Sequence, residues 1–336
     1  MADQYRRILS ALSASQRVLV TTHVRPDGDA LGTAAAMVLA MRRKKIDSRV
    51  LLLSHLPSKY AFVFEENQIP YTDVEKGWPA DFSLDSFDTL LVVDTGTWSQ
   101  LPGLKDRLAT WNRPKLVVDH HLTQEEWATE KLVITEAAAA GEIAAELIEQ
   151  WEVALDRQIA TVLFVAIASD TGWFQFSNTR PFTHRLAASL MEAGVDTDRV
   201  YQLVYQNERP SRVALQTRAM QSMELLADNR LAILSLGKEA FAETGAGVGD
   251  TENVINVPLQ IRTIEAVALL VDPPDGGPIR ISLRSKGRVD VAHFAEQFGG
   301  GGHARAAGMK VATSLESARE AVIKSMLEEL KAGDST

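Results

Sequence analysis

Acidic and histidine residues gather directly after three short apolar runs and one longer run of the chain. Those after the short runs are His23, Asp27 and Asp29; Asp94; and Asp119, His120 and His121, while Asp170 follows the longer run. Carboxylates and imidazoles bind divalent cations, and several carboxylates in one place repel one another unless cations neutralise them. Two such ions about 3.5–4 Å apart can clamp the attacking and leaving oxygens of a phosphoryl transfer. The pattern therefore predicts a centre for two metal ions.

Each of these fragments also has a purely structural interpretation. Asp27-Gly28-Asp29 and Asp94-Thr95-Gly96 are typical of turns, Asp29 could be the N-cap of a following helix, and a lone DHH triplet is common. The metal interpretation is favoured because each of the predicted strands in this half ends in acid or histidine, whereas the strand interiors carry neither.

The elements that must position these residues alternate along the first half. Strands are expected from RVLVTT (17–22), TLLVVD (89–94) and KLVVD (115–119), which are apolar throughout, as strands covered on both faces are. Helices are expected over 30–43, 141–151 and 159–169 from their Ala, Leu and Met content. This order predicts a doubly wound parallel sheet, a fold in which ligands bind at the carboxyl ends of the strands.

The last hundred residues predict a second, smaller α/β domain. LAILSL, EAVALLV and IRISLRS are typical of strands, and DPPDGG between the last two is typical of a turn. A helix at VAHFAEQF, a GGGGH run and a closing helix over 315–331 follow. We expect a first domain over 1–205, a helical linker over 206–229 and a second domain over 230–336, with a cleft between the domains.

Composition narrows the class of protein. The 336 residues are 46% hydrophobic and contain no cysteine, so thiolate metal ligands and disulfides are excluded. No apolar run reaches the ~18 residues needed to cross a bilayer, and we expect no signal peptide and a cytoplasmic location. The net charge of −9 argues against a large basic surface for long duplex nucleic acid.

Five segments, in order, resemble the motifs of the DHH phosphoesterase superfamily. HVRPDGDA, VVDTG, VDHH and SDTGWFQFSNT are similar to the four motifs of its N-terminal domain, and GGGGHARAAG is similar to the hallmark of the DHH-associated C-terminal domain. The size and pairing of the domains most resemble the nanoRNase/pAp phosphatase proteins. AAAAGEIAAELI departs from the pattern, because relatives often carry Ser or Thr where this chain has Ala140.

The resemblance implies a role for each residue of the predicted centre. The implied cofactor is a pair of manganese ions, with magnesium, cobalt or iron as alternatives. The implied ligands are His23 and Asp27 for one ion; Asp29, His120 and Asp170 for the other; and Asp94 for both. Asp119 would orient an imidazole. His121 would face the scissile phosphate, either steadying its charge or protonating the leaving oxygen.

A second set of residues is expected to bind substrate in the C-terminal domain. Arg280, Ser282 and Arg284 alternate with apolar residues, so a strand would place them on one face. Glycines let a backbone approach a phosphate closely. An ordinary solvated face and a flexible glycine turn are the structural alternatives. The residues we expect to form a phosphate and nucleotide pocket facing the metal centre are Arg280, Arg284, Ser285, Gly300, Gly301, Gly302 and His303.

The resemblance implies an enzyme that hydrolyses short oligoribonucleotides to mononucleotides and removes the 3′-phosphate from 3′-phosphoadenosine 5′-phosphate. Its partners would be these small nucleotides, with neither long duplex nucleic acid nor a membrane, and a homodimer is one expected assembly. The alternatives are a phosphodiesterase of linear or cyclic dinucleotides, a single-strand exonuclease and a non-catalytic nucleotide sensor.

Overall fold

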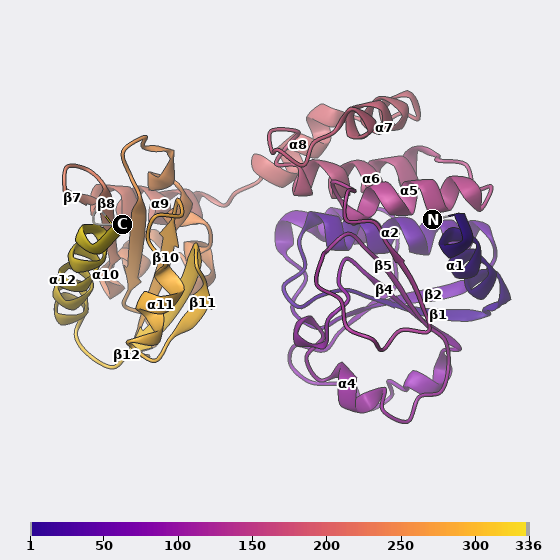
Figure 1. Ribbon diagram of the computed structural model, residues 1–336, viewed down its shortest axis with the longest axis horizontal. Coiled ribbons are helices and arrows are strands. Elements are labelled where there is room, and N and C mark those ends of the chain that lie inside the picture. The colour runs from indigo at the N-terminus through magenta and orange to yellow at the C-terminus, as the bar shows by residue number, and fades with distance from the viewer. Residues whose placement is uncertain (1, 334–336) are drawn as a thin grey trace. The chain divides into compact units, whose positions relative to one another are not determined.

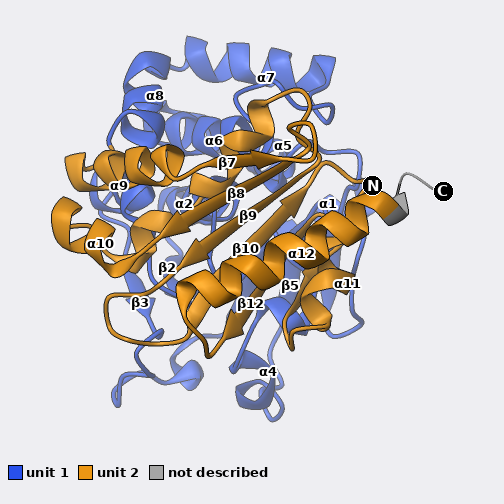
Figure 2. Ribbon diagram, turned by 90° about the vertical axis from the view of Figure 1, so that its left-hand side faces the viewer, with its two compact units in different colours: residues 1–207 blue, residues 208–336 orange. Residues whose placement is uncertain are grey.

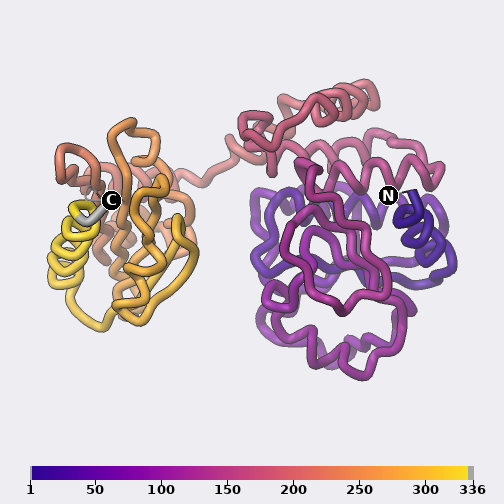
Figure 3. The backbone as a smooth tube through the Cα atoms, in the orientation of Figure 1, coloured from indigo at the N-terminus to yellow at the C-terminus, as the bar shows by residue number. Residues whose placement is uncertain are grey.

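The computed structural model describes residues 2–333, which divide into two compact units with the boundary between residues 207 and 208 (Figure 2). Figure 3 traces the chain from the N-terminal helix to the C-terminal helix. The expected boundaries at 205/206 and 229/230 stay predictions. Within the expected linker, Leu215 and Ala219 are fully buried against the second unit's sheet, so this stretch packs as part of that unit.

The first unit is built on a six-stranded sheet in which every pairing between neighbouring strands is parallel. The strand order is β3-β2-β1-β4-β5-β6. The strands are β1 (Arg17–Thr21), β2 (Asp47–Leu52), β3 (Tyr71–Asp73), β4 (Thr89–Val93), β5 (Lys115–Asp119) and β6 (Glu130–Val133). The predicted doubly wound sheet is confirmed, and the chain reverses its direction of strand addition between β1 and β4, which is where such sheets bind ligands.

Helices cover this sheet in layers (Figure 1). The helices of the first unit are α1 (Ala2–Ala14), α2 (Gly28–Arg43), α3 (Ala61–Glu65), α4 (Leu104–Arg107), α5 (Ala140–Gln150), α6 (Arg157–Asp170), α7 (Pro181–Glu192) and α8 (Thr197–Tyr205). Apolar residues on both faces of the central strands enter two separate cores. The near-continuous apolar runs of the sequence are explained by this double burial.

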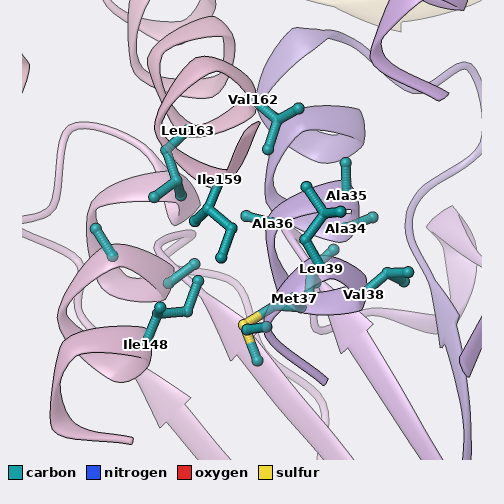
Figure 4. Packing of buried hydrophobic residues seen from close by; sticks show 14 of the residues in the cluster. Ala34, Ala35, Ala36, Met37, Val38, Leu39, Ile148, Ile159, Val162 and Leu163 are labelled. Atoms are coloured by element: carbon teal, nitrogen blue, oxygen red, sulfur yellow. The ribbon is translucent and has the colours of Figure 1, made fainter. Parts of the chain in front are cut away.

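Small residues bring α2 and α6 into close contact (Figure 4). A Cβ atom at Gly32 would lie 2.4 Å from the carbonyl oxygen of Val162, and one at Gly28 would lie 2.6 Å from Ser169. The first turn of α2 therefore lies against the last turn of α6. This packing places Asp170, the last residue of α6, beside the acids at the start of α2.

The second unit contains a mixed six-stranded sheet of order β11-β12-β10-β9-β8-β7, in which β8 and β9 are parallel and the other pairings are antiparallel. Its strands are β7 (Glu224–Leu226), β8 (Leu231–Leu236), β9 (Ala266–Val271), β10 (Ile279–Ser285), β11 (Gly301–His303) and β12 (Ala306–Val311). Its helices are α9 (Pro210–Gln221), α10 (Lys238–Thr244), α11 (Val291–Glu296) and α12 (Leu315–Gly333). Among the described residues, none of the helices has the length and apolar character needed to span a membrane.

Candidate metal centre

Three adjacent strands and the ends of two helices bring the predicted ligands to one edge of the first sheet. β4 pairs with β1 on one side and with β5 on the other. His23 lies two residues beyond β1, Asp94 directly follows β4, and Asp119 ends β5. All predicted metal-binding residues lie in groups whose ligand atoms are within 4.8 Å of one another. These groups are His23, Asp27 and Asp94; Asp29, His120 and Asp170; and Asp94, His120 and His121.

Asp94 is the residue shared by both halves of the centre. Its Oδ2 lies 3.4 Å from Nε2 of His23, and its Oδ1 lies 3.4 Å from Nε2 of His120. The side chain is 3% exposed, and the buried Oδ1 has no hydrogen-bond partner within the part of the chain that the structure describes. A buried carboxylate oxygen without a partner is costly. A cation between Asp94 and each imidazole would remove that cost, so the residues present fit a pair of metal ions.

Backbone carbonyls orient the two imidazoles toward this carboxylate. Nδ1 of His120 lies 3.1 Å from the carbonyl oxygen of Ala137, and Nδ1 of His23 lies 3.1 Å from that of Val24. Donation from Nδ1 leaves Nε2 as the atom that faces the centre, as in metal sites where the second imidazole nitrogen fixes the ring. Both Nε2 atoms are therefore presented as ligands.

Asp29 is held by the start of α5. Its Oδ2 accepts the N–H of Ala140 at 2.6 Å, and its Oδ1 accepts the N–H of Gly141 at 2.9 Å and the hydroxyl of Thr33 at 3.0 Å. The side chain is fully buried, with Oδ2 3.8 Å from Nε2 of His120. Because Ala140 contributes its backbone N–H, the hydroxyl that relatives often carry at this position is not needed to hold Asp29.

The acids at the two helix ends complete the groups. Asp27, rather than Asp29, is the N-cap of α2, and its Oδ1 accepts the N–H groups of Asp29 and Ala30 at 3.0 and 3.1 Å. Nε2 of His23 lies 4.0 Å from this same oxygen. At the end of α6, Oδ2 of Asp170 lies 3.5 Å from Nε2 of His120.

The pKa values record how strongly these groups interact. Burial, followed by the carboxylates of Asp94 and Asp170, holds the pKa of Asp29 well above its ordinary value. Burial also raises the pKa of Asp170 to about 6, although His120 opposes the rise. Burial would lower the pKa of His23 and His120, but the adjacent Asp94 outweighs it and raises them to about 9 and about 10. Without metal, protons held by these groups therefore reduce the repulsion among the crowded carboxylates.

Asp119 orients His121 rather than His120. Oδ1 of Asp119 accepts a hydrogen bond from Nδ1 of His121 at 2.8 Å and another from the backbone N–H of His120 at 2.8 Å. Its Oδ2 accepts Nε2 of Gln124 at 2.5 Å. Asp119 is fully buried, whereas the side chain of His121 is 55% exposed. The hydrogen bond to Asp119 raises the pKa of His121, so a buried carboxylate holds an accessible imidazole that can carry a proton.

Several supporting residues were not predicted from the sequence. Gln124 holds Asp119, and Gly96 leaves room for it, because a Cβ there would overlap the Gln124 amide. Nδ2 of Asn178 donates to the carbonyl oxygens of Asp170 and Ala138 at 3.1 and 3.0 Å. The residues of segment 137–141 act through their backbone, so their side chains gave no signal.

In the second unit, alternation along β10 places Arg280, Ser282 and Arg284 on one face, as predicted. Their apolar neighbours on the other face are buried in the core with α11 and α12. Through β12, Arg284 pairs with Ala306, and Ala306 pairs with His303. We call this set, Arg280, Ser282, Arg284, His303 and Lys310, the basic face; small residues (Ala306, Gly308 and Gly301) lie between its members in register.

Of the remaining predicted residues of this unit, Ser285, Gly300 and Gly302 make contacts within the fold, and substrate binding by them stays a prediction. Ser285 is buried, and alternation places it on the face opposite Arg284, where its hydroxyl donates to the carbonyl oxygen of Ala304 at 3.4 Å. A Cβ at Gly300 would lie 2.4 Å from the Gly308 carbonyl oxygen, and one at Gly302 would lie 2.4 Å from that of Ala306. These two glycines allow close strand packing, while Gly301 has open space around its Cα.

A parallel α/β sheet whose central strands end in this convergence of carboxylates and imidazoles fits a metal-dependent phosphoesterase. The family model described as "DHH family, N-terminal domain" matches residues 17–167, and the one described as "DHHA1 domain" matches residues 229–332. The chain therefore carries a DHH-family N-terminal domain in its first unit and a DHHA1 domain in its second unit.

Similar proteins cover almost the full chain. The bifunctional oligoribonuclease and PAP phosphatase NrnA of Thermus thermophilus is 28% identical, over 98% of this chain and 95% of the relative. The crystal structure of an exopolyphosphatase-related protein from Bacteroides fragilis is 21% identical, with a TM-score of 0.85 over 99% of this chain and 98% of that one. Exonuclease RecJ bound to manganese is 16% identical, with a TM-score of 0.54 over 95% and 92% of the two chains. The likeness to these two solved structures shows a shared fold.

Proposed function

We propose that this phosphoesterase is manganese-dependent, hydrolyses oligoribonucleotides from dimers to pentamers, and converts 3′-phosphoadenosine 5′-phosphate to AMP. The observation that carries the proposal is Asp94, a buried carboxylate with one oxygen facing each of two imidazoles. The activity named for the Thermus thermophilus relative supports this choice of substrates.

In this proposal, the two halves of the centre each hold one divalent ion. His23 and Asp27 would hold the first ion, Asp29, His120 and Asp170 the second, and Asp94 both. When bound, such ions acidify water and offset the charge of a phosphodiester. The mixture of carboxylates with two imidazoles suits manganese better than magnesium, which prefers an all-oxygen environment.

His121 would act on the leaving oxygen. Because Nδ1 donates to Asp119, its Nε2 is the nitrogen available to a substrate. The raised pKa of His121 favours the protonated ring. Its Nε2–H can then give a proton to the departing oxygen as a general acid. Asp119 would hold the tautomer and stabilise the imidazolium until that proton leaves.

The basic face of the second unit would bind a phosphate of the substrate. Arg280 and Arg284 have no acidic partner among the described residues, whereas Arg288 lies 3.2 Å from Oε1 of Glu265. A guanidinium without a carboxylate partner can form charge-assisted hydrogen bonds with phosphate. A face this small neutralises only a few phosphates, which favours short substrates over long strands.

The test is a product assay with a panel of substrates. Purified protein is incubated with a diribonucleotide, 3′-phosphoadenosine 5′-phosphate, a cyclic dinucleotide or a single-stranded twenty-mer, with manganese, with magnesium or with a chelator. We expect the first two substrates to be hydrolysed fastest and only when metal is present. Faster hydrolysis of the cyclic dinucleotide or of the twenty-mer would replace our proposal with the corresponding alternative. A cytoplasmic location and a homodimer stay predictions.

A further inference from the structure

A cavity of about 510 Å³ lies beside α6, the helix that ends at Asp170. None of the predicted metal ligands lines it. Its lining comes from α6, from the turn that follows Asp170, and from α7 and α8. Figure 1 shows α7 and α8 as an outer layer over α5 and α6. The volume is within the ~300–1,000 Å³ typical of small-molecule sites.

Phe164, Trp173, Phe174 and Tyr201 line this cavity, and Tyr205 lies outside the lining but contacts Trp173. Trp173 makes edge contacts with Phe164, Tyr201 and Tyr205, with ring centroids 5.6, 5.0 and 5.7 Å apart. Tyr201 and Tyr205 remain 38% and 44% exposed. Tyr201 lines the cavity and keeps part of its ring accessible to a planar ligand, whereas Phe174 is already stacked on His184 with ring centroids 5.5 Å apart.

The turn that supplies two of the rings is held in an unfavourable backbone conformation. Gly172, Trp173 and Phe174 follow one another with φ values of 55°, 59° and 66°. Bulky residues rarely adopt positive φ, and such conformations concentrate at functional sites. The N–H of Trp173 donates to the carbonyl oxygen of Ala168 at 2.7 Å, and that of Phe174 donates to the hydroxyl of Thr171 at 3.1 Å. The fold therefore fixes both rings next to the end of α6.

The same turn ties the cavity to the metal centre. Trp173 follows Asp170 by three residues, so their Cα atoms are at most ~11 Å apart.

The polar residues that line the cavity are Thr197 and Asp198 of α8 and His184 of α7. Gln202 donates to Oδ2 of Asp198 at 2.8 Å, and Oδ1 accepts no hydrogen bond from any residue that the structure describes. That oxygen can accept a hydrogen bond from an amino group.

We infer that this aromatic cavity binds a nucleobase that carries an exocyclic amino group, by stacking on its rings and donating to Asp198. This inference rests on the proposed function: the base would belong to the nucleotide next to the hydrolysed phosphate. Aromatic side chains bind unpaired bases in this way. The site makes adenosine the preferred purine over inosine, in which an oxo group replaces the amino group.

Binding of free nucleosides to the metal-free protein tests the site without relying on catalysis. Adenosine, inosine and ribose are titrated by calorimetry into the unmodified chain, Tyr201→Leu and Asp198→Ala. Tyr71→Leu is the matched control, because Tyr71 is 43% exposed and makes an edge contact with Phe64 at 5.5 Å. Thermal unfolding of each variant establishes that it is folded.

We expect adenosine to bind the unmodified chain and the Tyr71 variant equally, and ribose to bind neither. Tyr201→Leu should weaken adenosine binding about 5- to 150-fold, the range for losing one base–aromatic stack. Asp198→Ala should abolish the preference for adenosine over inosine. Unchanged adenosine binding in Tyr201→Leu would overturn the inference, as would no binding to the unmodified chain.

Sedimentation of the same proteins tests the competing occupant, a second copy of this chain. A dimer that Tyr201→Leu dissociates, together with no adenosine binding, would assign the cavity to that copy and overturn the inference. If adenosine binds as expected but none of the substrate panel is hydrolysed, the proposed function fails while the nucleobase site stands.

Discussion

The carboxylate of Asp119 is fully buried and accepts a hydrogen bond from Nδ1 of His121 at 2.8 Å, while the imidazole of His121 is 55% exposed. The adjacent His120 instead places its Nδ1 on the carbonyl oxygen of Ala137 and its Nε2 beside three carboxylates. Two neighbouring histidines are thus oriented by different partners, one by a side chain and one by the backbone. This difference separates a residue suited to proton transfer from one suited to metal binding.

His121→Ala is therefore expected to lower turnover by about 10²–10⁴-fold, the usual effect of losing an acid–base group, while both metal ions are retained. The measurement is kcat for the diribonucleotide alongside metal content. His293→Ala is the control, because His293 is also exposed and lies outside the groups that could bind metal. Loss of metal from the His121 variant would show that the roles of His120 and His121 are exchanged.

Asp94→Asn is expected to abolish hydrolysis and to reduce bound manganese below two ions per chain. The backbone of Asp94 has a φ of 61°, a conformation that Asn tolerates well, so the fold should be retained. The change removes the charge that faces both His23 and His120. Metal content and thermal unfolding are measured together, with Asp47→Asn at the start of β2 as the control, because Asp47 lies outside the groups that could bind metal. A folded Asp94 variant with near-normal turnover would contradict the bridging role.

Much of this centre follows from the sequence because its chemistry is carried by side chains at strand ends. The apolar runs at 17–22, 89–94 and 115–119 form adjacent parallel strands, and their polar ends meet as expected. The helix expected over 159–169 is α6, and it delivers Asp170 to the same place.

The rest was hidden because it depends on the backbone or on neighbours distant in sequence. Alanines and a glycine at 137–141 hold His120 and Asp29 through a carbonyl and two N–H groups, and such groups have no residue type to detect. The GGGGH run predicts a phosphate cradle, which stays a prediction, and the structure adds that Gly300 and Gly302 allow close strand packing. Sequence alone does not distinguish these two uses of glycine.

Binding of manganese should release protons and strengthen as pH rises. Without metal, the pKa values of His23 and His120 are about 9 and about 10, so both imidazoles are protonated at neutral pH. Metal binds the neutral ring, so each ion must displace a proton. Between pH ~6 and ~8.5, affinity should rise by up to about tenfold per pH unit for each proton displaced.

Calorimetry in buffers of different ionisation enthalpy measures this proton release directly. His293→Ala is the control, because His293 lies in the second unit, outside the groups that could bind metal. Its proton release should equal that of the unmodified chain. An affinity that does not change with pH, without proton release, would show that the two imidazoles are not ligands.

Arg284→Ala is expected to remove the preference for short substrates. Arg284 lies on the basic face, in register with Ala306 and His303 across β12, and has no acidic partner among the described residues. Losing a hydrogen bond to a charged group costs about 1.5–3 kcal/mol, so kcat/KM for the diribonucleotide should fall about 10- to 150-fold. The twenty-mer, which gains little from one terminal contact, should change far less, and manganese binding should be unaffected.

Arg288→Ala provides the matched comparison for this change, because Arg288 is also a cation of the 280–288 stretch but is already paired with Glu265 at 3.2 Å. Its removal should leave kcat/KM for both substrates nearly unchanged. The two substrates must be compared at one salt concentration, since binding of the longer strand weakens steeply as salt rises. If the unmodified chain favours the twenty-mer, or if Arg284→Ala and Arg288→Ala reduce diribonucleotide hydrolysis equally, then Arg284 does not select short substrates, because its effect would be that of any cation on this stretch.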